Sequence, residues 1–114
     1  MFKHLHYTEV PAEVVEVEGA DKVTVRWVIS EADGAPNFAM RIFEFEPAGH
    51  SPYHAHDWEH ETFILEGDGY LTIEGEKRPF KSGDVIFLPG GTTHNFTAGE
   101  NGMRMMCLVS NGCK

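Results

Sequence analysis

Apolar and polar residues alternate with a period of two along most of this chain, as they do in β-strands that bury one face. The alternating segments are rich in β-branched and aromatic residues, which strands favour. Apolar spacing typical of an amphipathic helix is almost absent. We therefore predict strands at Val23–Ile29, Phe38–Glu46, Thr62–Leu65, Tyr70–Ile73, Val85–Leu88 and Met103–Val109.

Short segments that contain glycine or proline separate these predicted strands. Such residues supply the backbone conformations that turns require. The segments lie at residues 32–36, 47–49, 66–69, 74–76, 82–84 and 89–91. Many short strands at nearly regular spacing predict an all-β fold, an antiparallel sandwich or barrel with little or no helix. A chain of 114 residues fits a single domain, which we place at residues 1–114.

Charge and cysteine content narrow the classes of partner. A net charge of −9 and the absence of any basic cluster argue against nucleic acid and anionic membranes as partners. No apolar stretch has the length of a signal peptide or a membrane span, so we expect a cytoplasmic protein. The two cysteines, Cys107 and Cys113, lie close together near the C-terminus, and we expect free thiols rather than a disulfide.

Four of the seven histidines have a spacing that suits metal binding. His54 and His56 share one face of an extended strand, and His60 can rejoin that face where the next strand begins. His94 follows a Pro-Gly-Gly turn and can reach the same place from across a barrel. Neutral imidazoles bind Mn, Fe, Co, Ni, Cu and Zn. The alternatives are ordinary core or surface histidines, or a helical zinc site, but Asp57 stands where the metalloprotease motif requires glutamate.

The spacing of these residues resembles the two sequence motifs of the cupin superfamily. The first motif, at residues 48–67, is carried by Gly49, the pair His54 and His56, His60 and Gly67. The second, at residues 83–98, runs with the family's spacing through Gly83, Pro89, Gly91 and His94. The separation between the two motifs is typical of short, single-domain cupins.

Three positions depart from the family pattern. Ala48 replaces a glycine, Ala98 replaces an asparagine, and His60 stands where the family has a glutamate ligand, while Glu61 points to the opposite face. The resemblance therefore implies a double-stranded β-helix, or jelly-roll barrel, that holds one divalent transition metal per chain on four histidines. Loss of the carboxylate would make the metal a stronger Lewis acid and leave two coordination positions open. Which of Mn, Fe, Zn, Ni, Co or Cu is bound stays open.

Alternation also nominates Arg41 as a residue near the metal. Two inward-facing sets are compatible with the segment 38–46, namely Arg41, Phe43 and Phe45, or Met40, Ile42 and Glu44. The two aromatics favour the first set. Arg41 would then lie in the barrel mouth and could bind a substrate carboxylate or enolate. Alternatively, Arg41 pairs with Glu44 or Glu61 on the outer face.

A second candidate catalytic residue, besides Arg41, is Cys107. A free cysteine is most often a small buried residue, but a thiol near a redox metal would be oxidisable. Four further residues are expected to line the pocket, namely Phe43, Phe96, Met105 and Trp58.

Three functions fit such a site. The favoured one is an enzyme that acts on a small organic molecule, either by dioxygenase-like oxidation or by Lewis-acid isomerase, cyclase or lyase chemistry. The second is a small-molecule binding or sensor module, which is weaker because no helix-turn-helix is attached. The third is a purely structural metal. We also expect a homodimer in which the N-terminal strand, or the outer face of the sheet with Trp27 and its apolar neighbours, is buried against a second copy.

Overall fold

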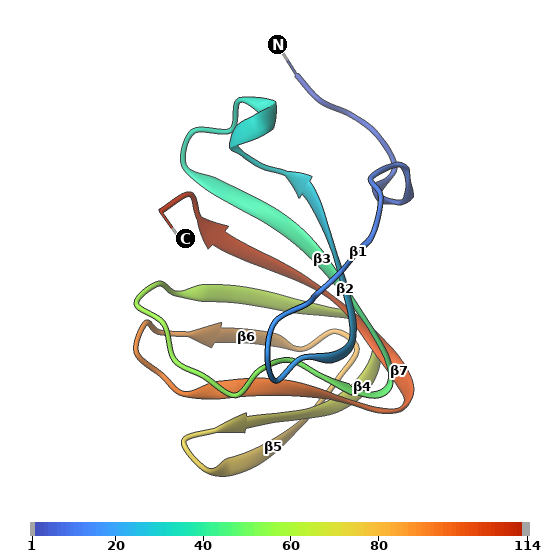
Figure 1. Ribbon diagram of the computed structural model, residues 1–114, viewed down its shortest axis with the longest axis vertical. Coiled ribbons are helices and arrows are strands. Elements are labelled where there is room, and N and C mark those ends of the chain that lie inside the picture. Colours follow the sequence, from blue (N-terminus) through green and yellow to red (C-terminus); the bar gives the residue numbers. More distant parts are fainter. Residues whose placement is uncertain (1, 113–114) are drawn as a thin grey trace.

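The computed structural model describes residues 2–112, where strands account for most of the chain (Figure 1). The strands are β1 (Glu13–Val14), β2 (Asp21–Ile29), β3 (Phe38–His50), β4 (His60–Ile73), β5 (Glu76–Lys81), β6 (Val85–Leu88) and β7 (His94–Ser110). Two 3-10 turns are also present, η1 (Tyr7–Glu9) and η2 (Glu31–Asp33). The predicted all-β fold with little helix is confirmed. Within residues 2–112, no helix has the length and apolarity needed to cross a membrane.

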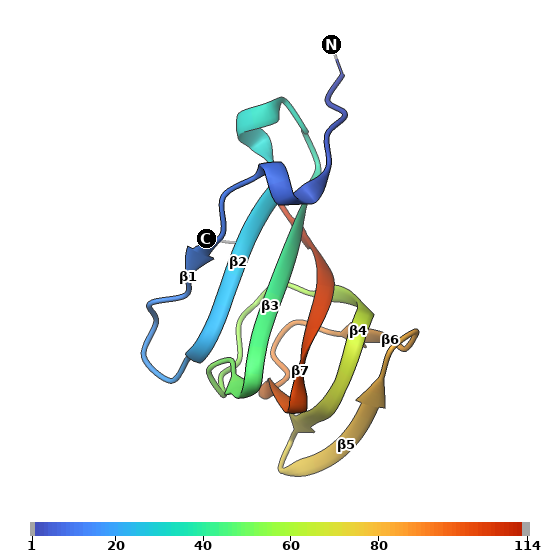
Figure 2. The same cartoon turned by 90° about the vertical axis from the view of Figure 1, so that its right-hand side faces the viewer.

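The strands pair antiparallel in the order β1-β2-β3-β7-β4-β5, and β6 pairs with β4. Figure 2 shows β1, β2, β3, β7 and β4 following one another across the molecule. The last strand thus lies between the third and the fourth, which is a jelly-roll connection rather than a meander. The predicted jelly-roll barrel is confirmed, and its inner face collects residues that are far apart in the sequence.

Two of the predicted turns are wrong, because these segments lie inside long strands. Residues 47–49 belong to β3, where the pairing with β7 shifts between Phe45 and His50. Residues 66–69 belong to β4, where Gly67 has a φ of 83° and an added Cβ would clash with the carbonyl of Gly102. Glycine there permits a β-bulge, which bends a strand without reversing it.

The pattern of alternating apolar residues does not predict β5 or the first half of β7. The segment Glu76–Lys81 is mostly charged and contains Pro79, so it has no alternating apolar pattern. It forms a strand at the edge of the sheet, where a proline need not donate to a neighbour. Cys113 lies outside the described residues, and Cys107 is a free, buried thiol.

The core lies between the inner faces of the curved sheet. It is made of apolar residues from β2, β3, β4, β5, β6 and β7, and its buried members include Val23, Phe45, Ile64, Leu71, Phe80, Leu88, Phe96 and Met103. This core supports one side of the cavity that the histidines face.

Candidate metal centre

One row of paired residues crosses four strands on the inner face of the sheet. Trp27 of β2 is opposite Arg41 of β3, Arg41 is opposite Cys107 of β7, and Cys107 is opposite Thr62 of β4. Directly paired residues project to the same face of a sheet. Since His60 lies two residues before Thr62, it shares that face. The strand register therefore brings Arg41 and Cys107 to His60.

Three segments bring the predicted histidines to one end of this face. His60 is the first residue of β4, His94 is the first residue of β7, and the loop between β3 and β4 carries His54 and His56. The backbones of His54 and His94 hydrogen-bond in both directions, at 3.2 and 3.1 Å. This isolated bridge fixes the loop against β7.

The glycines of the Pro-Gly-Gly turn hold His56 in place. The N–H of Gly91 donates to the carbonyl of His56 at 2.7 Å. At Gly90 an added Cβ would clash with the carbonyl oxygen of Asp57, so a larger residue would push this loop away from the site. The glycines of the second sequence motif are thus needed in part because they pack against the loop of the first motif.

The ligand atoms of His56, His60 and His94 all lie within 4.8 Å of one another. The Nε2 atoms of His56 and His60 are 2.7 Å apart. His54 is exposed and is not one of these three, although its ring centroid lies only 5.1 Å from that of His56 and 6.0 Å from that of His94. The structure therefore brings three of the four predicted ligands together and leaves His54 at the rim.

In two of the rings, the hydrogen bond made by Nδ1 leaves Nε2, the nitrogen that faces the cluster, unprotonated (bare). Nδ1–H of His56 donates to the carbonyl of Trp58 at 3.1 Å, and Nδ1–H of His94 donates to the carbonyl of Thr92 at 2.8 Å. The indole of Trp58 also stacks on His56, with the centroids 4.3 Å apart. Carbonyl partners of this kind orient metal-binding histidines and fix their tautomer. The donor set fits a transition metal such as Zn, Fe, Co, Ni or Cu.

The clustered histidines are held neutral. Burial, followed by the positive charge of Arg41, lowers the pKa of His60 to about 3. Burial also lowers the pKa of His56 and of His94, and the backbone carbonyls that accept from their rings partly oppose this effect. A neutral imidazole is the form that binds metals.

Arg41 lies against this cluster and has no acidic partner among residues 2–112. Its Nη2 donates to Sγ of Cys107 at 3.1 Å, and its guanidinium lies over the rings of Trp27 and Phe43, at 5.3 and 4.9 Å from their centroids. Its Nε is buried, and no group in the described part of the chain hydrogen-bonds to it.

The alternative outer-face ion pair of Arg41 is wrong. Glu44 pairs instead with Arg26 and Arg104, at 2.9 and 3.5 Å, on the opposite side of β3. Glu61 is exposed and lies on the outer face of β4. Arg41 therefore faces the cavity with the aromatic residues of its own strand.

The histidines open into a cavity of about 320 Å³. The residues that were predicted to line the pocket all contribute to its wall, namely Phe43, Phe96, Met105 and Trp58, as do Arg41 and Cys107. Sequence reasoning missed several further wall residues, namely Val15, Val17, Val25, Trp27 and Pro52. The placement of Trp27 on an outer dimer face is wrong, because its ring lies over Arg41 in this cavity.

Comparison with known proteins places this geometry in a family. Residues 41–110 match the cupin domain. The polyketide cyclase RemF from Streptomyces resistomycificus superposes with a TM-score of 0.92 and is 37% identical, over 97% of this chain and 80% of that one.

Two curated proteins from other organisms are also similar. The dimethylsulfoniopropionate lyase DddW of Ruegeria pomeroyi is 32% identical over 101 residues, which are 83% of this chain and 66% of the lyase. Acireductone dioxygenase of Xenopus laevis is 34% identical over 76 residues, which are 60% of this chain and 38% of the dioxygenase. The chain thus spans just under two thirds of the lyase's length and less of the dioxygenase. Because the matched domain covers more than half of the chain and contains both histidine motifs, this protein belongs to the cupin family.

Proposed function

We propose that this cupin is a metal-dependent enzyme that acts on a small organic molecule with an apolar body and a carbonyl group. The proposed reaction is a redox-neutral cyclisation, isomerisation or elimination that begins at the carbon next to the carbonyl. One observation carries the proposal: three histidine ligand atoms converge at an apolar cavity that also contains Arg41, which has no acidic partner within residues 2–112.

The metal ligands would be the three clustered histidines and His54, whose side chain lies at the rim of the same cavity. A bound divalent metal would polarise a carbonyl oxygen and acidify the neighbouring C–H bonds. The chain supplies the rest of the site. Phe43, Phe96 and Trp58 bind the apolar body and exclude water. Arg41 carries a positive charge beside His60, where it stabilises a carboxylate or enolate oxygen of the substrate.

The named relatives support the redox-neutral reaction. RemF is a polyketide cyclase and matches nearly the whole of this chain, and DddW is a lyase that matches most of it. Both names describe reactions without net oxidation. The similarity to acireductone dioxygenase supports dioxygenase-like oxidation as a second candidate, over a shorter segment.

The first measurement is the metal content of untagged protein, purified without chelator or nickel resin, by mass spectrometry. We expect about one transition-metal ion per chain, because the converging histidines form a single site. Protein that contains no metal and takes up none when Mn, Fe, Co, Ni, Cu and Zn are offered would contradict the proposal.

The second measurement separates the candidate reactions with 1-phenyl-1,3-butanedione, an apolar diketone. Anaerobically in D₂O, the metal-loaded protein should speed deuterium exchange at the central carbon, as followed by proton NMR. The variant His60→Ala should lose this activity and the matched variant Glu61→Ala should keep it, because Glu61 faces outward. Oxygen uptake with the diketone would instead favour the dioxygenase, and saturable binding without exchange or uptake would favour a sensor.

A further inference from the structure

The surroundings of His60 differ from those of the other two clustered histidines. Nδ1 of His56 and Nδ1 of His94 each face a backbone carbonyl, which can only accept, so both rings carry their proton on Nδ1. Nδ1 of His60 instead lies 3.2 Å from Nη2 of Arg41 and 3.1 Å from Sγ of Cys107. A guanidinium can only donate, and a thiol is a weak acceptor. Among residues 2–112, therefore, no strong hydrogen-bond acceptor lies at Nδ1 of His60.

The hydrogen-bond partners of the neighbouring rings determine which nitrogen of His60 carries the proton in the metal-free protein. Since His56 carries its proton on Nδ1, its Nε2 is bare, and the contact of 2.7 Å to Nε2 of His60 requires His60 to donate. The neutral His60 ring then has a bare Nδ1, which accepts from Nη2 of Arg41. A continuous chain of hydrogen bonds results, from Arg41 through His60 and His56 to the carbonyl of Trp58.

Metal binding requires the opposite tautomer of His60. A ligating Nε2 must be bare, so the proton of the neutral ring has to reside on Nδ1. There it would oppose the N–H of Arg41, and the acceptor within reach is Sγ of Cys107, a residue that is only 2% exposed. Arg41 donates to the same sulfur, at 3.1 Å, and the two lone pairs of a thiol sulfur allow it to accept from both groups.

We propose that Arg41 and Cys107 are positioning residues that set the tautomer of His60. In the metal-free protein Arg41, which donates to Nδ1, and the unprotonated Nε2 of His56 together hold His60 with its proton on Nε2. On metal binding Cys107 accepts the hydrogen bond from the proton that has moved to Nδ1. The proton leaves Nε2 and arrives at Nδ1 of the same ring through solvent, so the ring stays neutral and no other reactant is needed. This inference rests on the metal site of the proposed function, but not on turnover.

Nitrogen NMR of histidine-labelled protein tests the tautomers directly. Without metal, His60 should show a protonated Nε2 and a bare Nδ1, whereas His56 and His94 should show the reverse. With zinc, all three rings should carry the proton on Nδ1. The variant Arg41→Met should move metal-free His60 toward the Nδ1–H tautomer. Metal-free wild-type protein with His60 already protonated on Nδ1, or an Arg41→Met variant with an unchanged tautomer, would overturn the proposal.

The affinity for zinc, measured by competition with a chelating dye, tests the role of Cys107 as the acceptor for Nδ1–H of His60. Cys107→Ala should weaken zinc binding by about tenfold or more, which is the usual effect of losing the partner of a ligating histidine. Val109→Ala is the matched control, because Val109 is equally buried on the same face of β7 and its loss affects packing alone. An equal loss in both variants, or an unchanged affinity in Cys107→Ala, would overturn the inference. A wild-type protein that fails to bind zinc and every other metal would overturn the proposed function as well.

Discussion

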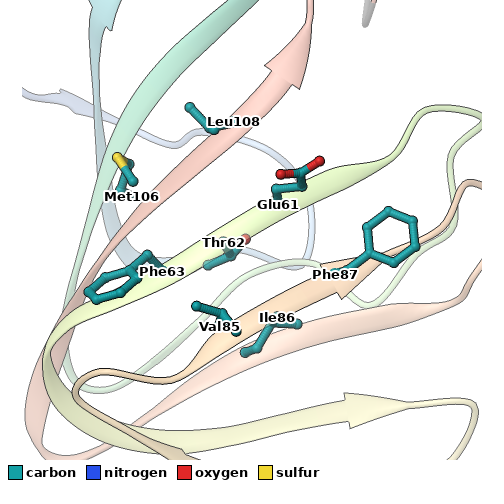
Figure 3. A pocket seen from close by; sticks show the side chains of 8 residues that line it. All are labelled: Glu61, Thr62, Phe63, Val85, Ile86, Phe87, Met106 and Leu108. Carbon is teal, nitrogen blue, oxygen red and sulfur yellow. The ribbon is translucent and has the colours of Figure 1, made fainter.

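Two hollows of similar size lie on opposite faces of the same strands. The inner cavity, of about 320 Å³, contains the clustered histidines, and the outer groove, of about 410 Å³, lies along β4, β6 and β7 (Figure 3). Eight residues border the outer groove, namely Glu61, Thr62, Phe63, Val85, Ile86, Phe87, Met106 and Leu108. Two of them, Thr62 and Ile86, belong to the inward-facing sets of their strands. Both hollows are mainly apolar, and the outer one is the larger.

Alternation along β4 and β7 explains how one pair of strands serves both hollows. His60 faces the inner cavity and Glu61 the outer groove, and Cys107 faces inward between Met106 and Leu108, which line the groove. The inner cavity alone has several polar side chains that converge on one point. In the outer groove a single charged residue, Glu61, lies at the edge of apolar neighbours (Figure 3). Size and apolarity therefore do not identify a site, whereas convergent polar groups do.

The largest difference between the two faces should appear in the metal content of variants at two adjacent residues of β4, His60 and Glu61. His60→Ala removes a buried ligand and should reduce bound metal from about one ion per chain to a small fraction of that. Glu61→Ala, one residue further on the outer face, should leave the metal content unchanged. Mass spectrometry of both variants, grown and purified together, makes the comparison. An equal loss of metal in the two variants would contradict the assignment of faces.

A second pair of adjacent residues on β4, Ile64 and Leu65, allows the packing of the two faces to be compared. Ile64 has no exposed surface and sits in the core, whereas Leu65 is 40% exposed. Ile64→Ala should lower the free energy of unfolding by about 2–5 kcal/mol, because it leaves a cavity. Leu65→Ala should cost about 1 kcal/mol or less. Denaturant unfolding of the metal-free variants measures both values, and similar costs would mean that the outer face of β4 is covered in solution.

The sequence was sufficient to tell which residues of a strand share a face, and to identify the family. A side-chain period of two places Arg41 and Phe43 on one face and puts His60 and Glu61 on opposite faces, whatever the neighbouring strands are. The glycine, proline and histidine spacing of the two motifs then indicated a cupin barrel.

What the sequence could not supply is the register between distant strands. Arg41 and Cys107 are paired across β3 and β7 although they are far apart along the chain, and nothing in either segment specifies that pairing. Trp27 was placed on the wrong face for the same reason, since its role depends on being opposite Arg41. The bulge at Gly67 looked like a turn because glycine permits both.

The third prediction concerns the pH dependence of stability, because the buried, neutral histidines lie on the inner face of the sheet. Above pH 6.5 His60 is neutral in both the folded and the unfolded chain. As the pH falls below 6.5, the unfolded chain binds a proton there, whereas folded His60 stays neutral until about pH 3. The free energy of unfolding of metal-free protein should therefore fall, by at most about 1.4 kcal/mol per pH unit from this residue. Denaturant unfolding from pH 7 to pH 4 should show a shallower fall in His60→Asn, and parallel curves would contradict the prediction.

The smallest effect is expected from the outer groove. Phe87 is 58% exposed, so Phe87→Ser should change the free energy of unfolding by no more than about 0.5–1 kcal/mol. Both tryptophans of the chain, Trp27 and Trp58, line the inner cavity, and their fluorescence therefore reports on ligands bound there. Titration with 1-phenyl-1,3-butanedione should quench this fluorescence equally in the wild type and in Phe87→Ser. Phe43→Ser should weaken the titration, because Phe43 forms the inner wall beside Arg41. If Phe87→Ser weakened binding of the diketone instead, the outer groove would be the binding site. Apolar area, rather than the convergence of polar groups, would then be the feature that selects the ligand.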